Sequence, residues 1–172
     1  MQSSKKLIVG GVAGALGTAA MDLVWYRRYR NGGGKEPLWR WESAAGVMGW
    51  DEASAPGQLG RKVLRAVSRR EPPDEWARTT TNLVHWATGV AWGLQYGALA
   101  SRTSQHPVLR AALLGPAAWL SGYVLLPLAK VYKPIWEYDR RTLTDDLSAH
   151  LVYGAATSTG FAVLARPRRT PH

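Results

Sequence analysis

The charged residues of this 172-residue chain are strongly segregated, and four windows contain no Asp, Glu, Lys or Arg. The first window holds 15 residues, and the other three hold 23, 19 and 19. A helix that crosses the roughly 30 Å hydrocarbon core of a bilayer needs about 20 mostly apolar residues. The segregation therefore favours membrane-spanning helices. The windows are Leu7–Met21, Thr79–Ser101, Ala111–Ala129 and Leu147–Ala165.

We predict an all-α fold, an integral membrane bundle of four transmembrane helices that forms a single domain over 1–172. The first window reaches spanning length because the residues after Asp22 are again apolar, which places one carboxylate inside that helix. Pro116 and Pro127 fall inside the third helix, where a membrane helix tolerates them better than a soluble one. The predicted spans are 6–27, 78–100, 108–131 and 144–165, and the polar connection is 28–76.

The first window has competing interpretations. Lys5 and Lys6 before an apolar run resemble a signal peptide, but the residues after Asp22 make a poor cleavage site. The glycine spacing is not that of a dinucleotide-binding loop, and no alternation of strands and helices follows. A buried helix of a soluble protein is a third interpretation, which Thr18 and the glycine content do not exclude. A membrane helix explains more, because small residues four positions apart let a neighbouring helix pack closely. The residues assigned to this packing are Gly10, Gly14 and Gly17.

Aromatic residues gather at one set of predicted helix ends, which we call the belt side. The chain has nine Trp and seven Tyr but one Phe, a choice typical of membrane–water interfaces. Of the 22 Lys and Arg residues, 15 also fall on this side. The positive-inside rule therefore favours the cytoplasm for loops 28–76 and 132–143 of a multi-pass inner-membrane protein. The belt residues are Trp25, Tyr26, Trp76, Tyr132, Trp136 and Tyr138.

The connection 28–76 contains a predicted basic amphipathic helix, which begins near Pro56. Its apolar residues recur at helical spacing, so we expect an interfacial helix that contacts anionic lipids. A solvated cap over the bundle is the alternative. The apolar face is Leu59, Val63, Ala66 and Val67, the lipid-surface residues are Arg61, Lys62, Arg65, Arg69 and Arg70, and further predicted interfacial anchors are Trp39, Trp41 and Trp50.

Composition excludes several classes of site. The chain has no cysteine, which rules out disulfide scaffolds, thiolate zinc sites, iron–sulfur clusters and cysteine nucleophiles. The net charge is +10, but the basic residues flank the apolar windows and the sequence has no nucleic-acid-binding motif. We therefore predict no nucleic-acid partner. Motifs of catalysis are absent from the sequence as well, and the expected function is non-enzymatic.

Ionisable residues inside the predicted spans are the main indication of function, because such groups are costly in a bilayer. Asp22, His85 and His150 fall one to two turns from the belt-side ends of their helices, at one membrane level. Two further polar residues lie one turn nearer the surface. We predict that all five form one polar cluster, which consists of Asp22, Asn82, His85, Asp146 and His150.

Four roles remain open for this cluster. Polar contacts could simply tie the helices together. The cluster could relay protons or bind a polar solute, since histidine titrates near physiological pH. His85 and His150 could hold haem b, because a glycine follows each by four residues and leaves room. Asp22 could join both histidines around a divalent metal ion. The shared His-x-x-x-Gly spacing also suggests a duplicated two-helix hairpin.

The chain resembles small four-span membrane proteins of bacterial proteomes rich in Ala, Arg and Gly. The features behind this resemblance are Gly-Val-Ala-Gly-Ala-Leu-Gly-Thr-Ala-Ala-Met-Asp at 11–22, His85-Trp86 and His150-Leu151-Val152-Tyr153-Gly154. The resemblance implies a multi-pass membrane protein and assigns no catalytic residue. We therefore expect a small transport or channel-like component, or a subunit of a homo-oligomer or larger membrane complex. A haem- or metal-binding membrane protein is the alternative.

Overall fold

The computed structural model describes residues 3–102 and 107–166, which form six α-helices, three 3-10 turns and no strand. The all-α prediction is therefore confirmed for the described residues. The long helices are α1 (Ser3–Asn31), α4 (Ala77–Arg102), α5 (Pro107–Leu128) and α6 (Arg140–Leu164). The short elements are α2 (Leu38–Glu42), η1 (Trp50–Glu52), α3 (Ala55–Ser68), η2 (Asp74–Trp76) and η3 (Ile135–Glu137).

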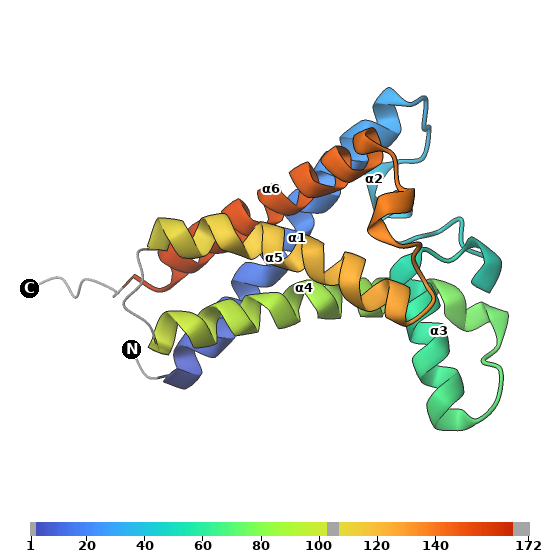
Figure 1. The fold of residues 1–172 in the computed structure, drawn as a ribbon, viewed down its shortest axis with the longest axis horizontal. Coiled ribbons are helices and arrows are strands. Elements are labelled where there is room, and N and C mark those ends of the chain that lie inside the picture. The colour runs from blue at the N-terminus through green and yellow to red at the C-terminus, as the bar shows by residue number, and fades with distance from the viewer. Residues whose placement is uncertain (1–2, 103–106, 167–172) are drawn as a thin grey trace, which may run out of the picture.

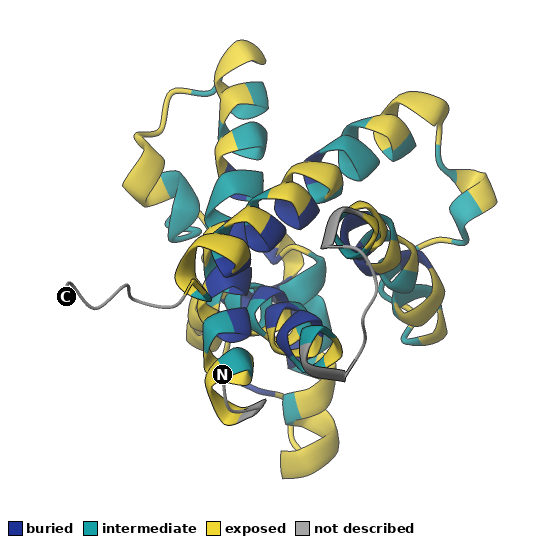
Figure 2. Cartoon of the chain, turned by 90° about the vertical axis from the view of Figure 1, so that its left-hand side faces the viewer, coloured by how far each residue is buried: buried dark blue, intermediate teal, exposed yellow. Residues whose placement is uncertain are grey.

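The four long helices run back and forth along the long axis of the molecule, as Figure 1 shows. The beginning of α1 and the end of α6 lie at one end, while α2 and α3 lie at the other, which is the belt side. α1 packs against both α4 and α6, and α5 packs mainly against α6. Figure 2 shows buried residues on the sides of the helices that face one another and exposed residues along their outer sides.

Within the described residues, two helices are long and apolar enough to cross a membrane, α1 over Ser4–Asn31 and α5 over Leu109–Leu128. α4 and α6 match the other two predicted spans in position and length but do not reach the same apolarity. Both helices carry polar residues at their belt-side ends and on buried faces, which lowers their mean hydropathy. The predicted four-span bundle is therefore not confirmed.

Two helix ends differ from the prediction for local reasons. α1 continues to Asn31 and ends at a glycine run in which Gly33 adopts a φ of 92°, a conformation that glycine adopts without strain. α5 ends at Leu128 rather than at 131, because Lys130 has a φ of 54° and leaves the helical path. Pro116 and Pro127 both lie inside α5, as predicted.

Glycines determine how closely α1 approaches α4. A Cβ atom on Gly14 would lie 2.5 Å from the carbonyl oxygen of Gly89 and 2.9 Å from the Cα of Gly93. Gly10 faces Gly93 and Gly97 in the same way, one turn nearer the termini. Two rows of small residues thus let the two backbones touch, the packing that small residues at four-residue spacing permit.

The contacts of α6 also depend on small residues. Gly17 of α1 lies against Tyr153 and Thr157 of α6. On its other side α6 meets α5, where a Cβ on Gly154 would lie 2.7 Å from the backbone nitrogen of Gly115. α1 therefore crosses α4 closely and α6 crosses α5 closely, while α1 and α6 also pack against each other.

A second small core lies at the belt side, under α3. Trp50 is only 2% exposed, packs with Ala53 and Ala77, and donates from Nε1 to the carbonyl oxygen of Pro72 at 2.8 Å. Trp50 is thus a core residue. The prediction that it anchors the chain at a membrane interface was wrong, because its ring is buried against Ala53 and Ala77. By contrast Trp39 is 67% exposed.

Candidate functional site

Asp22 and His85 form a buried pair between α1 and α4. Both carboxylate oxygens of Asp22 lie 3.0 Å from Nε2 of His85. The side chain of Asp22 is 7% exposed and that of His85 is 28% exposed. The α1–α4 crossing produces this contact, since Asp22 lies two turns beyond Gly14 and His85 one turn before Gly89, on antiparallel helices.

α2 brings a second carboxyl group to this pair. Burial, and then the negative charge of Asp22, raise the pKa of Glu42 above its ordinary value, while a charge on His85 acts in the opposite direction. Glu42 also interacts with Trp86, the neighbour of His85. The connection 28–76 offers no periodic pattern around this five-residue helix, so sequence reasoning did not identify Glu42.

Hydrogen bonds from α4 hold the end of α2 in place. Nε of Arg78 donates to the carbonyl oxygen of Ser43 at 2.9 Å, and Nδ2 of Asn82 donates to the same oxygen at 3.0 Å. Asn82, which was predicted to belong to the cluster, thus fixes the segment that follows Glu42. The Asp22–His85 pair is covered on its belt side by a segment that α4 itself anchors.

Glu42→Gln is expected to raise the melting temperature at neutral pH but to have no effect well below pH 4.5, the ordinary pKa of this group. Because the folded state raises the pKa, it favours the protonated carboxyl. The associated stability is present at acid pH and is lost as the pH rises through the folded pKa. Thermal unfolding of the detergent-solubilised protein across this range measures the effect. The exposed Glu75→Gln variant is the control, and a pH profile of Glu42→Gln parallel to wild type would contradict the assignment.

His150 and Asp146 form a separate pair on α6. Nδ1 of His150 lies 3.3 Å from Oδ1 of Asp146 and 2.9 Å from the carbonyl oxygen of the same residue. In the described part of the chain, no hydrogen bond or ion pair joins this pair to Asp22 or His85. The structure therefore arranges the five predicted residues as two groups, with Asn82 beside the first.

Three tyrosines cluster at the α5–α6 end, and two of them interact with Asp146. The rings of Tyr123, Tyr132 and Tyr138 lie with centroids 5.3 to 6.0 Å apart. Burial, and then the charge of Asp146, raise the pKa of Tyr132 to about 12. These rings pack against one another, so the second group combines aromatic and polar contacts at the α5–α6 end.

Buried hydroxyl groups continue from the first pair into the bundle. Thr18 is fully buried one turn before Asp22 and donates to the carbonyl oxygen of Gly14 at 3.0 Å. Tyr153 of α6 is 2% exposed and donates to the carbonyl oxygen of Gly89 at 2.7 Å. Thr157 lies one turn further along α6 and is fully buried, and its side chain interacts with that of Tyr153.

Arg28 links α1 to α6 at the belt side. Its guanidinium donates to the carbonyl oxygen of Asp145 at 2.7 Å and to Oγ of Ser148 at 2.6 Å. The same group lies 3.8 Å from the carboxylate of Asp145. Sequence reasoning counted Arg28 only as a charge of the belt side, because nothing in the spacing of these residues shows that α1 and α6 are neighbours.

The two carboxylate–histidine contacts are suited to proton exchange. Among the described residues, no group of three His, Cys, Asp or Glu side chains is placed to hold a metal ion. Nε2 of His85 faces Asp22, and Nδ1 of His150 faces Asp146, so each histidine has a carboxylate at one of its two ring nitrogens. A carboxylate and an imidazole in contact can pass a proton between them, and hydroxyl groups both donate and accept.

Comparison with known proteins provides no relative whose function could be transferred to this chain. No known protein family, no curated protein and no solved structure matches the chain.

Proposed function

We propose that the chain is a four-span integral membrane protein that works as a small, proton-conducting transport or channel-like component. The observation that carries this proposal is Asp22, a carboxylate that is 5% exposed inside an apolar helix and in contact with a histidine. Ionisable groups at such positions mark proton and ion pathways in membrane proteins.

Large apolar side chains on the outside of all four long helices support the embedding. On α1, Ile8, Val12 and Leu16 are 67%, 49% and 50% exposed and form a stripe at four-residue spacing. Continuous apolar outer surfaces of this kind fit lipid better than water. The other exposed apolar residues include Leu83, Leu94 and Leu99 of α4, Leu113, Leu120, Val124 and Leu125 of α5, and Leu151, Val152, Val163 and Leu164 of α6.

The lower apolarity of α4 and α6 agrees with this proposal. Both helices bury polar side chains, of which Thr81, against α3, and Thr157 and Ser158 of α6 are at most 9% exposed. A membrane helix with a buried polar face has a lower mean hydropathy, although its outer face contacts lipid. With four spans, the excess of Lys and Arg on the belt side favours the cytoplasm for loops 28–76 and 132–143 of a protein in the cell membrane.

The proposed proton path begins at Glu42. This carboxyl lies at the belt-side surface of the pair, and the Asp22–His85 contact connects it to the interior. From there the hydroxyl groups of Thr18, Tyr153 and Thr157 lead towards the terminal side. The side chains of Tyr153 and Thr157 interact one turn apart on α6, and hydroxyl groups both donate and accept, so this pair supports a path along α6.

Proton uptake into proteoliposomes tests the function. Vesicles that hold the purified protein and an internal pH-sensitive dye are expected to acidify under an imposed membrane potential. Asp22→Asn is expected to reduce this flux to that of protein-free vesicles, because an amide does not exchange a proton near neutral pH. The matched control is Asp51→Asn, the same change at an exposed position outside the four long helices.

Two results would contradict the function. Asp22→Asn that conducts like wild type would show that the pair is not on the path. A folded and inserted wild type that conducts no faster than empty vesicles would indicate a subunit of a larger membrane complex instead.

A further inference from the structure

α3 carries an exposed apolar stripe that is distinct from the face with which it packs against the protein. Gly57 and Gly60 are buried against the first turns of α4. The stripe consists of residues four positions apart, of which Val63 is 55% and Val67 82% exposed. At about 100° per residue, the stripe and the packing face lie on neighbouring sides of the helix. The packing against α4 therefore leaves Val63 and Val67 uncovered.

The direction of α3 explains what these side chains meet. Figure 1 shows α3 running across the direction of the long helices, at the belt-side end of the bundle. If the long helices cross the bilayer, α3 lies parallel to its surface at the depth where the spans end. Amphipathic helices in this position place their apolar face at the boundary of headgroups and acyl chains.

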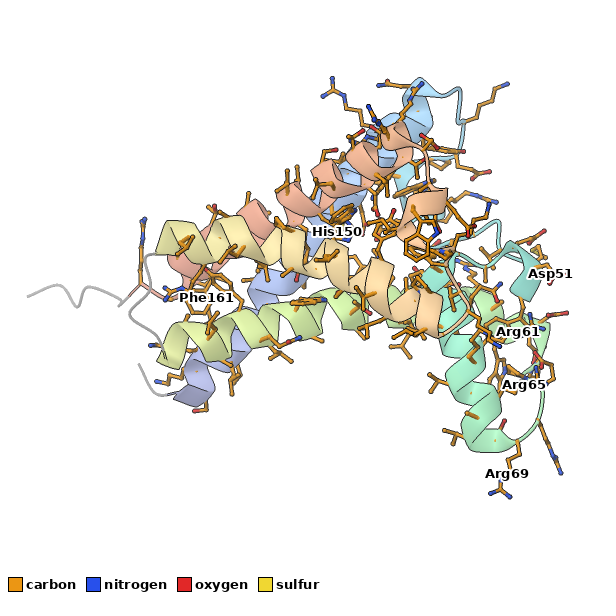
Figure 3. The ribbon with its side chains drawn as sticks, in the orientation of Figure 1. Asp51, Arg61, Arg65, Arg69, His150 and Phe161 are labelled. Carbon is orange, nitrogen blue, oxygen red and sulfur yellow. The ribbon has the colours of Figure 1, made fainter. Side chains whose placement is uncertain are left out.

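The basic residues of α3 fall into two sets. Arg61 and Arg65 lie 2.6 Å and 3.6 Å from the carboxylate of Glu71. Figure 3 shows both on the side of α3 that faces away from the long helices. Their charge is thus partly neutralised, and they lie nearly opposite Val63 on the helix. These two arginines do not lie where headgroup phosphates would be.

Lys62, Arg69 and Arg70 form the second set. None of the three makes an ion pair with a described residue. Lys62 is exposed and lies between the two sets round the helix, about 60° from Arg65 and about 100° from Val63, and it lines one hollow with Arg61 and Arg65. Arg69 ends the helix with a φ of 57°, and Figure 3 shows its side chain extending beyond the end of α3. Uncompensated cations beside an exposed apolar stripe complement an anionic lipid surface.

We propose that α3 lies in the belt-side surface of the bilayer, with Val63 and Val67 in its apolar boundary and Lys62, Arg69 and Arg70 on the phosphates of anionic lipid headgroups. The proposal rests on the embedding under Proposed function but not on proton conduction. Only three of the five basic residues predicted to contact lipid are assigned to headgroups. Arg61 and Arg65 form ion pairs with Glu71 instead.

Depth measurements on the full-length protein in lipid nanodiscs test the position of α3. Because the chain has no cysteine, a single cysteine can carry an environment-sensitive dye at Val63, at Arg65 or at Val124, an exposed residue of α5. We expect quenchers on the acyl chains to quench the dye at Val63→Cys and at Val124→Cys. We expect aqueous iodide to quench the dye at Arg65→Cys.

The label on α5 separates failure of this proposal from failure of the embedding. If acyl-chain quenchers reach the dye at Val124→Cys while iodide quenches the dyes at positions 63 and 65 equally, α3 is off the membrane and the inference is wrong. If iodide also quenches the dye at Val124→Cys, the embedding itself is wrong, and the inference fails with it.

Charge variants test the headgroup contacts. One basic residue near an anionic surface contributes about a fivefold preference for anionic over neutral lipid. We therefore expect the triple variant Lys62→Gln, Arg69→Gln, Arg70→Gln to retain at least tenfold less phosphatidylglycerol relative to phosphatidylcholine after purification from mixed micelles. The double variant Arg61→Gln, Arg65→Gln is the control and is expected to retain as much as wild type. Equal retention by wild type and the triple variant, or an equal loss in both variants, would overturn the assignment.

Discussion

Gly14→Val is expected to destabilise the protein by about 3 kcal/mol, the upper end of what extra atoms in a packed interface cost. Even the first added carbon would lie 2.5 Å from the carbonyl oxygen of Gly89 and 2.9 Å from the Cα of Gly93. Both are backbone atoms, which cannot turn away as a side chain can. The substitution therefore forces α1 away from α4 and also separates Asp22 from His85.

Equilibrium unfolding in mixed micelles measures this loss, with Gly122→Val as the matched control. Gly122 lies inside α5, and a Cβ there would meet nothing nearer than 4.0 Å. Valine is a better helix former than glycine, so the control is expected to unfold no earlier than wild type. Equal destabilisation by the two variants would show that the cost comes from valine in a helix and not from the crossing.

His85→Leu is expected to cost about 3 to 5 kcal/mol, because it leaves the buried carboxylate of Asp22 without its partner. Replacing both residues removes the unpaired charge as well. The double variant Asp22→Leu, His85→Leu is therefore expected to be more stable than His85→Leu alone. A double-mutant cycle of unfolding free energies measures the coupling between the two side chains.

An exposed ion pair provides the comparison for this cycle. Arg141 and Asp145 lie 3.9 Å apart on α6, and the side chain of Arg141 is 92% exposed. Breaking it with Arg141→Gln is expected to change stability by at most about 1 kcal/mol. If the effects of Asp22→Leu and His85→Leu simply add, the two side chains are not coupled, and the pair has no special energetic role.

The long helices could be predicted because charge marks their ends. Each of the four windows without charge coincides with one long helix, and the predicted spans differ from the helix bounds by at most four residues at either end. The pattern did not distinguish the helices by apolarity, however. A window without charge counts Thr157 and Ser158 as neutral, whereas their hydroxyl groups lower the hydropathy of α6.

The candidate site could be predicted only in part, because depth along a helix can be counted but helix neighbours cannot. Counting turns from the belt side placed Asp22, His85 and His150 at one level. The glycine crossings then decided the partners, so that Asp22 meets His85 while His150 pairs with Asp146 on its own helix. Glu42 lies in the short helix α2 of the long connection, and no periodicity in the sequence indicates that it contacts the first pair.

The basic helix shows the same limit. The amphipathic pattern predicted a helix near 56–70, and α3 occupies Ala55–Ser68. Sequence spacing treated all its basic residues alike. Only the fold of the loop that follows α3 brings Glu71 back onto Arg61 and Arg65, so that these two form ion pairs with it.

Sidedness of single cysteines in sealed vesicles tests the four-span embedding most directly. We expect a membrane-impermeant thiol reagent to find Asp51→Cys and Trp136→Cys on one side and Lys5→Cys on the other, since both belt-side loops then share a compartment. If only α1 and α5 cross the bilayer, Trp136→Cys lies on the side of Lys5→Cys and opposite Asp51→Cys. That result would contradict the bundle on which the proposed proton path depends.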